Sequence, residues 1–215
     1  MEPIQIYFEN SSLLICEKPA GISSEDDGLP DILCKQIGTS KLYTVHRLDS
    51  AVSGGIVYAK TREAAASLSS QIVSGDFSKK YIVVAEGLFD ENEGLWDDLL
   101  FYDRKQGKSY VVKREREGVK RALLRYKVMG NVLTKDGKEA SLIEFELLTG
   151  RTHQIRVQLA YRRHPVLGDR RYGSKEKISG IALRSYKLKF IDPETGTEME
   201  FESPIPDEYP WNNIV

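Results

Sequence analysis

Three short segments of this chain combine the residue types that reactions on an anionic substrate would use. They are His46-Arg47-Leu48-Asp49 followed by Ser53-Gly54-Gly55, then Lys79-Lys80-Tyr81, and then Gly150-Arg151-Thr152-His153-Gln154-Ile155-Arg156. A carboxylate such as Asp49 can act as a nucleophile or a general base, and the paired glycines after it are expected where backbone must approach a substrate closely. By residue type alone, a turn or helix cap explains Asp49, and strand packing explains Tyr81.

The elements that must position these segments are short strands and few helices. We expect helices at 29–37, ending at Gly38, after Thr61, which is a suitable N-cap, and at 152–163, where arginines would be presented. Alternating, β-branched or aromatic residues predict strands at 4–8, 12–17, 55–59, 80–86, 107–113, 122–129, 140–148, 181–190 and 198–201. This order predicts a mixed α/β (α+β) fold with a largely antiparallel central sheet flanked by helices and loops.

Length and composition are those of one globular domain. The chain has 215 residues, of which 40% are hydrophobic, so we expect a single catalytic domain over 1–215. No apolar run approaches the roughly 20 residues that cross a bilayer, and no secretory signal opens the chain. Cys16 and Cys34 lie in apolar surroundings without metal-ligand spacing, which predicts core thiols and a reducing, cytoplasmic compartment.

The formal net charge of −1 conceals a strongly uneven distribution. Residues 1–31, 86–103 and 191–215 each contain seven acids, and together they contain a single base. Residues 104–127 contain ten bases and two acids, and residues 150–175 contain seven bases and one acid. These runs either form a basic face that attracts a polyanion or interleave in space and cancel. The sequence leaves both alternatives open.

Taken together and in this order, the motifs resemble the RluA-type family of pseudouridine synthases over most of the chain. The resemblance begins at Glu17-Lys18-Pro19-Ala20-Gly21 and continues through the HRLD tetrapeptide, Lys80-Tyr81 with Gly87, Asp103-Arg104 and the GRTHQIR heptapeptide. It closes with His164-Pro165-Val166-Leu167-Gly168-Asp169 and Tyr172-Gly173. HRLD alone is moderately specific, but HRLD followed about a hundred residues later by GRTHQIR is highly specific.

The resemblance implies that the chain isomerises uridine to pseudouridine in RNA. Asp49 would be the catalytic aspartate, Tyr81 the active-site tyrosine, and Arg151 the arginine that pairs with the aspartate. The reaction breaks the N–C1′ bond, turns the uracil in place and rejoins it through C5, so we expect no metal and no other cofactor. A carboxylate can attack C1′ or remove a sugar proton to give a glycal, and the sequence does not choose between these routes.

The resemblance also implies contacts with RNA. An arginine at the place of Arg47 can fill the gap left by a base that is taken out of the stack. We expect the remaining substrate-binding residues to be Lys80, His46, His153, Gln154 and Arg156. Lys79, Lys80, Arg156, Arg162 and Arg170 are candidate phosphate contacts, or else solvated surface charges. The partner would be ribosomal or transfer RNA, with no obligate protein partner and a monomer as the default.

Two positions depart from the family pattern. Val52 stands where a threonine is common, and Glu17 stands where an asparagine usually precedes Lys-Pro. Both changes put the hydrogen bonding of the catalytic loop in question rather than the reaction. About sixteen residues precede Glu17, too few for the N-terminal S4 domain of many relatives, so we expect none.

Three other interpretations of these residues can be compared with this one. HRLD resembles a kinase catalytic loop, but no Gly-rich loop precedes it and no Asp-Phe-Gly follows it. A metal site is the second interpretation, but its candidate ligands, His46, His153 and His164, lack the short paired spacing of zinc ligands. The serious alternative is an RNA-binding module that has lost catalysis, against which the joint presence of Asp49, Tyr81 and Arg151 argues.

Overall fold

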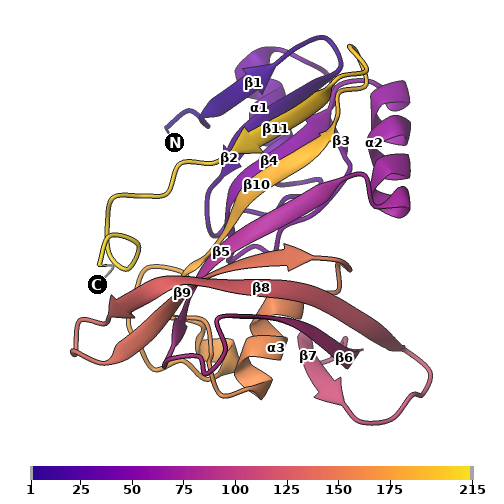
Figure 1. Ribbon diagram of the computed structural model, residues 1–215. Coiled ribbons are helices and arrows are strands. Elements are labelled where there is room, and N and C mark those ends of the chain that lie inside the picture. Colours follow the sequence, from indigo (N-terminus) through magenta and orange to yellow (C-terminus); the bar gives the residue numbers. More distant parts are fainter. Residues whose placement is uncertain (1, 214–215) are drawn as a thin grey trace. The chain divides into compact units, whose positions relative to one another are not determined.

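The computed structural model describes residues 2–213, which form two compact units (Figure 1). The first unit comprises the residues up to Lys79 together with Arg184–Pro204, and the second comprises Lys80–Leu183 and the residues from Ile205 onward. The single catalytic domain expected from chain length stays a prediction. No helix within residues 2–213 is long and apolar enough to span a bilayer.

The first unit is a sheet of short strands with two helices. Strand β2 pairs antiparallel with β1 and β4, β3 pairs antiparallel with β4, β10 runs parallel to β4, and β11 pairs antiparallel with β10. The strands are β1 (Ile6–Glu9), β2 (Leu13–Lys18), β3 (Tyr43–Thr44), β4 (Ser53–Ala59), β10 (Leu183–Ile191) and β11 (Glu198–Glu202), and the helices are α1 (Leu29–Ile37) and α2 (Arg62–Ser74).

Helix α2 covers the core of the first unit. Thr61 caps its N-terminus by accepting the Ala64 amide, and Ala64 and Leu68 are the residues of the helix that are buried. They belong to one apolar cluster with β2, β4 and β10, made up of Leu13, Ile15, Val57, Ala59, Ala64, Leu68, Phe77, Leu188 and Phe190. This cluster fixes the strands between which the Asp49 loop runs.

The second unit is an antiparallel sheet in the order β5-β9-β8-β6-β7. Its strands are β5 (Ser78–Glu86), β6 (Glu93–Asp103), β7 (Lys108–Val112), β8 (Val119–Leu133) and β9 (Glu139–Leu147), and α3 (Gln154–Tyr161) and the 3-10 turn η1 (Arg170–Tyr172) follow. Leu100, Ala122, Val157 and Tyr172 form a core between strands and α3. Helix α3 therefore positions the segment that contains Arg151.

The mixed α/β fold with a largely antiparallel sheet is confirmed, but one long strand was not expected. Strand β6 lies within the acidic run 86–103, for which the sequence predicted no strand. Trp96 and Leu100 of β6 are nevertheless buried, and the neighbouring carboxylates bind cations of other elements. Asp97 accepts from Arg121 Nε at 2.8 Å, and Asp98 accepts from Arg162 at 2.8 Å.

Replacing Gly54 at the start of β4 should destabilise the chain strongly. A Cβ atom there would lie 2.2 Å from the Ser185 carbonyl oxygen on β10, at a φ of +112°. We expect Gly54→Ala to lower the free energy of unfolding by about 3 kcal/mol or more, as measured by urea denaturation. The matched control is Gly75→Ala, where φ is +89° but nothing lies within 4 Å, so only the left-handed strain of about 1–2 kcal/mol is added. Equal losses in both variants would contradict the steric argument.

Candidate active site

Asp49 lies half-buried in the loop between β3 and β4, and hydrogen bonds fix the backbone on both sides of it. On one side, Ser24 Oγ donates to the Leu48 carbonyl at 2.9 Å and accepts from the Leu48 amide at 3.1 Å. On the other side, the Gly21 amide donates to the Ser50 carbonyl at 2.7 Å. The segment that carries the carboxylate is therefore held by the turn after β2.

The loop is also anchored by apolar side chains. Leu48 and Val52 flank Asp49 and are 5% and 3% exposed. The Val52 amide donates to the Asp49 carbonyl at 2.9 Å, so a turn closes directly after the carboxylate. This bond uses the backbone, and the departure from threonine at Val52 leaves it intact.

Lys18 is a site residue to which the sequence assigned no role. Its side chain is fully buried at the end of β2, and Nζ donates to the carbonyls of Pro19 at 2.8 Å and Ser50 at 3.1 Å. Burial lowers the pKa of Lys18 to about 8, while the Asp49 and Glu17 carboxylates act in the opposite direction. At neutral pH an ammonium ion therefore interacts with Asp49 and holds the carbonyl of the next residue. The signal in the sequence was a lysine at the end of a strand that begins with four apolar residues.

The paired glycines after Asp49 lie against other strands of the first unit. We expected them to admit a substrate, but each faces another part of the first unit. A Cβ on Gly54 would meet the backbone of Ser185, and a Cβ on Gly55 would lie 2.6 Å from the Phe201 ring. The glycines let β10 and β11 approach β4, and the close approach of a substrate to them stays a prediction.

His46 lies in the core of the first unit. It is 7% exposed, its Nε2 accepts from the Val57 amide at 3.2 Å, and its ring lies 5.4 Å from that of Phe77. Burial, and secondarily the charge of Lys79, lowers the pKa of His46 to about 3. A neutral imidazole that binds β4 supports the loop structurally, and this geometry does not favour the substrate contact expected of His46.

Arg47 has the opposite environment. Its side chain is 62% exposed, and Nη1 lies 3.0 Å from Glu25 Oε1 in an ion pair whose partner is 56% exposed. Such an exposed pair contributes at most about 1 kcal/mol. The guanidinium is therefore available to a stronger anionic partner.

The three residues of the second motif lie on β5, with Lys79 at the end of the first unit and the other two in the second. Burial lowers the pKa of Lys79. Lys80 Nζ donates to Glu144 on β9 at 2.8 Å, so its charge is already paired. Tyr81 is 6% exposed and lies opposite Phe145 on β9. Of these three residues, Tyr81 is the one that the packing against β9 holds in place.

Arg151 lies in a loop that Gln154 holds from within. The Gln154 side chain is buried, and its Oε1 accepts from the Arg151 amide at 3.0 Å and from Thr149 Oγ1 at 2.9 Å. Its Nε2 donates to the Leu123 carbonyl at 3.0 Å. Gln154 therefore fixes the loop to β8, a positioning role in place of the substrate contact expected of it.

The side chain of Arg151 is directed by a backbone carbonyl. Its Nε donates to the Arg121 carbonyl at 2.9 Å. His153, two residues later, adopts the left-handed conformation with φ +55°, and its Nδ1 lies 2.9 Å from the Tyr172 hydroxyl. A non-glycine residue in this conformation needs support from its surroundings, which the contact with Tyr172 provides.

Arg156 is not placed as a phosphate contact would be. It is 5% exposed, and its Nε and Nη2 donate to the two carboxylate oxygens of Asp169 at 2.6 and 2.9 Å. Arg156 thus forms a buried bidentate ion pair, and the substrate contact expected of it stays a prediction. Arg162 binds Asp98 and lies 4.1 Å over the Trp96 ring, whereas Arg170 is exposed.

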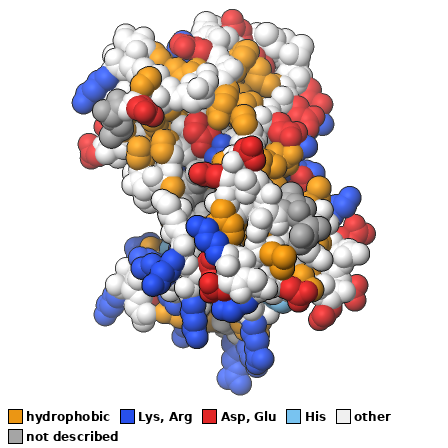
Figure 2. All heavy atoms as spheres, turned by 90° about the vertical axis from the view of Figure 1, so that its left-hand side faces the viewer, with side chains coloured by type: hydrophobic (Ala, Val, Ile, Leu, Met, Phe, Trp, Pro, Cys, Tyr) orange, Lys and Arg blue, Asp and Glu red, His pale blue; other side chains and the backbone are white. Residues whose placement is uncertain are grey.

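Charge separates between the two units. The first unit contains 10 bases and 15 acids, a net charge of −5, and the second contains 21 bases and 17 acids, a net charge of +4. Figure 2 shows lysine and arginine side chains gathered over the second unit on the displayed face. The pairing of Asp97 and Asp98 with arginines confirms that some of the acidic and basic runs cancel, but the second unit keeps an excess of positive charge.

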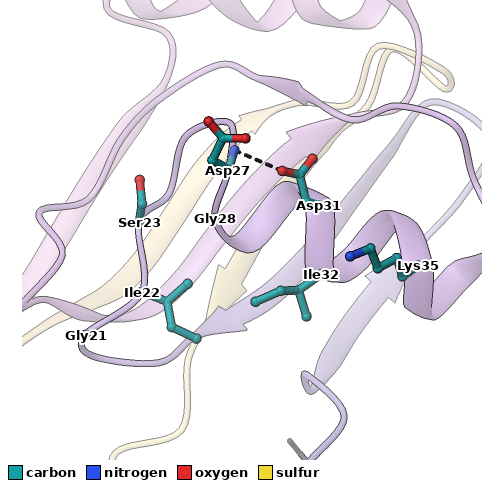
Figure 3. Close-up of a pocket in the computed structure, with 8 residues that line it drawn as sticks. All are labelled: Gly21, Ile22, Ser23, Asp27, Gly28, Asp31, Ile32 and Lys35. Carbon is teal, nitrogen blue, oxygen red and sulfur yellow. Dashed lines mark hydrogen bonds between the residues drawn. The ribbon is translucent and has the colours of Figure 1, made fainter.

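A shallow depression lies beside the first turn of α1 and is not suited to RNA. It measures about 500 Å³ and is lined by Gly21, Ile22, Ser23, Asp27, Gly28, Asp31, Ile32 and Lys35. Figure 3 shows the side chains of Ile22 and Ile32 extending toward one another, and the Asp27 amide donating to Asp31 at 2.9 Å. Two carboxylates against one ammonium disfavour a polyanion.

The structure thus places the candidate residues in two local clusters. Asp49 is grouped with Lys18, Ser50 and the turn after β2 in the first unit. Tyr81, and Arg151 with Gln154, belong to the second unit. Within the described part of the chain, no group of three His, Cys, Asp or Glu side chains is arranged to hold a metal ion. Cys16 and Cys34 are both free, and burial raises the pKa of both thiols.

Comparison with known proteins identifies the family of the chain. The model of the RNA pseudouridylate synthase family matches residues 12–161. An uncharacterized RNA pseudouridine synthase of Bacillus subtilis, YhcT, is 36% identical over 94% of this chain and 69% of its own length. Ribosomal large subunit pseudouridine synthase D of Borreliella burgdorferi is 32% identical over 96% of this chain and 67% of its own length. The corresponding synthase C of Buchnera aphidicola is 33% identical over 93% and 67%.

Solved structures show the same fold. Human RNA pseudouridylate synthase domain containing 1 superimposes with a TM-score of 0.83 at 23% identity, over 97% of this chain and 88% of that chain. Human RNA pseudouridylate synthase domain containing 4 gives a TM-score of 0.75 at 22% identity, over 94% and 88%. At this level of identity the likeness concerns the fold.

The buried ammonium of Lys18 should make stability depend on pH. Its pKa of about 8 lies below the ordinary 10.5, so between these values the unfolded chain holds a proton that the native chain has released. The free energy of unfolding then rises with pH across this window. Relative to Lys18→Met, we expect urea unfolding to show the wild type gaining up to about 3 kcal/mol as pH rises from about 7 to about 10. A difference that stays constant or falls with pH would contradict the assignment.

Proposed function

This chain belongs to the RluA-type family of RNA pseudouridine synthases, and we propose that it isomerises one or a few uridines of ribosomal RNA with Asp49 as the reacting carboxylate. As a member of this family it is an isomerase that acts on RNA. The observation that carries the proposal for Asp49 is its loop, which is fixed at Leu48 and Ser50 and lies beside the Lys18 ammonium. Fixed geometry at a reacting group can contribute several kcal/mol to lowering a barrier.

The chemistry needs only what these residues supply. In one route the Asp49 carboxylate attacks C1′ as the N–C1′ bond breaks, and it leaves again when C5 of the rotated uracil bonds to C1′. In the other route the carboxylate removes a proton from the sugar to give a glycal, and the proton returns after C5 has bonded. Both routes end when C5 loses its proton and N1, which has lost its bond to C1′, gains one. Both routes act through the Asp49 carboxylate, and the buried Lys18 ammonium places a positive charge beside it.

Two further residues are assigned the roles that the family resemblance implies. We assign Arg151 to pairing with Asp49, because a guanidinium orients a carboxylate and favours its ionised form. We assign Tyr81 to stacking on the uracil, since an aromatic ring holds a base at a gain of about 1–3 kcal/mol while leaving it free to turn in its plane. The Gln154 hydrogen bonds and the β5–β9 pairing, which fix the two residues locally, support these roles.

A uridine within folded RNA must leave the base stack before it can react. We assign Arg47 to the gap that the base leaves. This role is supported by the exposure of the Arg47 guanidinium and by the weakness of its ion pair with Glu25. An RNA phosphate or base edge can replace Glu25 as its partner.

The positive second unit is the natural contact for the RNA backbone. Relatives named as ribosomal large subunit synthases favour large-subunit ribosomal RNA as the substrate, and transfer RNA is the alternative. A chain that modifies either RNA would act in the cytoplasm. The excess of bases over acids in the second unit supports the RNA contact.

Replacing the carboxylate of Asp49 separates catalysis from binding. We expect Asp49→Asn to lower the rate of pseudouridine formation by at least about 10³-fold, because an amide neither attacks C1′ nor accepts a proton, while RNA affinity changes less than about threefold. Carbodiimide labelling with primer extension on RNA from deletion cells, rescued by each variant, measures the modification. Asp76→Asn, an exposed position in the same unit, is the matched control. Full activity of Asp49→Asn would overturn the proposal.

Removing the Arg47 side chain should affect folded RNA selectively. We expect Arg47→Ala to lower the rate on a stem-loop by about 10- to 100-fold and on an unstructured oligonucleotide by less than about threefold, because only the stem-loop has a stack to refill. Single-turnover rates on the two RNAs provide the measurement. Arg62→Ala on α2 is the control for lost positive charge. Equal losses on both RNAs would rule out the wedge role.

A further inference from the structure

The Glu17 carboxylate joins four segments of the first unit at the end of the Asp49 loop. Arg184 on β10 donates to both of its oxygens, at 2.8 and 2.7 Å. The Tyr7 hydroxyl on β1 donates to Oε2 at 2.9 Å, and the Gly54 amide at the start of β4 donates to Oε1 at 3.1 Å. One carboxylate therefore links β1, β4 and β10 to β2.

We propose that Glu17, held by Arg184, is a positioning residue that fixes Asp49 for the reaction through the Gly54 amide. This inference rests on the proposed role of Asp49. It goes beyond that role by assigning a function to a residue that does not touch the substrate.

Two consecutive residues of β2 hold the loop at two points. Lys18 donates to the Ser50 carbonyl, and Glu17 accepts from the Gly54 amide. Successive side chains of a strand point to opposite faces, so the two contacts restrain the loop from different sides. The restrained segment begins at Ser50, directly after Asp49. A displacement of the Asp49 backbone would therefore break one of these bonds.

The backbone of Gly54 is restrained by the strands on both sides of it. Gly54 pairs with Lys18 on one side and with Ser185 of β10 on the other. A Cβ atom at Gly54 would already be too close to the Ser185 backbone. Rotation or displacement of this peptide is thus blocked by β10, and the Glu17 hydrogen bond selects the remaining orientation.

The position also requires a carboxylate of this length. The Arg184 side chain is 7% exposed and that of Glu17 is 19% exposed, so an unpaired guanidinium here would be costly. Both oxygens of Glu17 are engaged by Arg184, while Oε1 also accepts from Gly54. The asparagine usual at this place in the family is shorter and uncharged, and it could not make the same bidentate pair.

The test compares two double variants that differ only in the acceptor for Gly54. Glu17→Gln/Arg184→Met keeps an amide oxygen in place, and Glu17→Met/Arg184→Met removes it, while neither leaves a buried unpaired charge. We expect the Met/Met variant to react about 10- to 100-fold more slowly than the Gln/Met variant in single-turnover pseudouridine formation. The RNA concentration for half-maximal rate should differ less than about twofold, since the RNA contacts are unchanged.

A direct measurement on the backbone accompanies the rates. Hydrogen exchange of the Gly54 amide should be faster in the Met/Met variant than in the Gln/Met variant. The control is Glu9→Met/Lys60→Met, which removes another ion pair of the first unit, 2.7 Å long, that does not contact the Asp49 loop. Its rate constant should equal that of the wild type.

Glu17→Asp keeps the test decisive if the Met/Met variant does not fold. The shorter carboxylate retains the charge opposite Arg184 but withdraws from Gly54, so it should lower the rate constant and leave the RNA concentration for half-maximal rate unchanged. Equal rate constants for the folded double variants, or a fully active Glu17→Asp, would overturn this inference alone. A wild type that forms no pseudouridine would overturn the proposed function and this inference with it.

Discussion

The buried ammonium of Lys18 is the constraint on which the geometry of the first unit depends. A cation withdrawn from water needs acceptors for its N–H groups, and here the Pro19 and Ser50 carbonyls provide them. One of those carbonyls belongs to the residue after Asp49. The requirement that stabilises the buried charge therefore also fixes the backbone at the candidate catalytic residue.

In the second unit, buried polar side chains also fix the backbone, but they are a neutral amide and a guanidinium paired with a carboxylate. Gln154 is buried and binds the backbone of Arg151 and Leu123. Arg156, two residues further along the chain, is buried against Asp169 in a bidentate pair. Buried polar groups must be hydrogen-bonded, and in this motif the bonds define the loop before the helix. Gln154 and Arg156 of the GRTHQIR heptapeptide thus stabilise the loop that contains Arg151 and the start of the helix that follows it.

This division of roles explains what the sequence could and could not predict. Helix α1 was predicted at its observed bounds because Gly38, in the left-handed conformation with φ +71°, ends it. Strand β6 was missed because its carboxylates interrupt the apolar pattern, and their partners, Arg121 on β8 and Arg162 after α3, are known only from the structure.

The site residues show the same limit. HRLD and GRTHQIR pointed to the two segments on which the proposed site rests, but residue type did not separate the exposed Arg47 from the buried His46 and Arg156. Burial is a property of the folded chain, and a charged side chain in a motif has the same letter in either environment. Lys18 was overlooked for the same reason.

Charge separation gives the two units different tasks toward a polyanion. The first unit, with a net charge of −5, repels phosphates, and the second, with +4, attracts them. Under the proposed function, the second unit is therefore the expected contact for the RNA backbone. The first unit contributes the Asp49 carboxylate, and the Lys18 ammonium places a positive charge beside it within a unit of negative net charge. We therefore expect variants of Asp49 to affect the rate constant and variants of the basic strands to affect RNA binding.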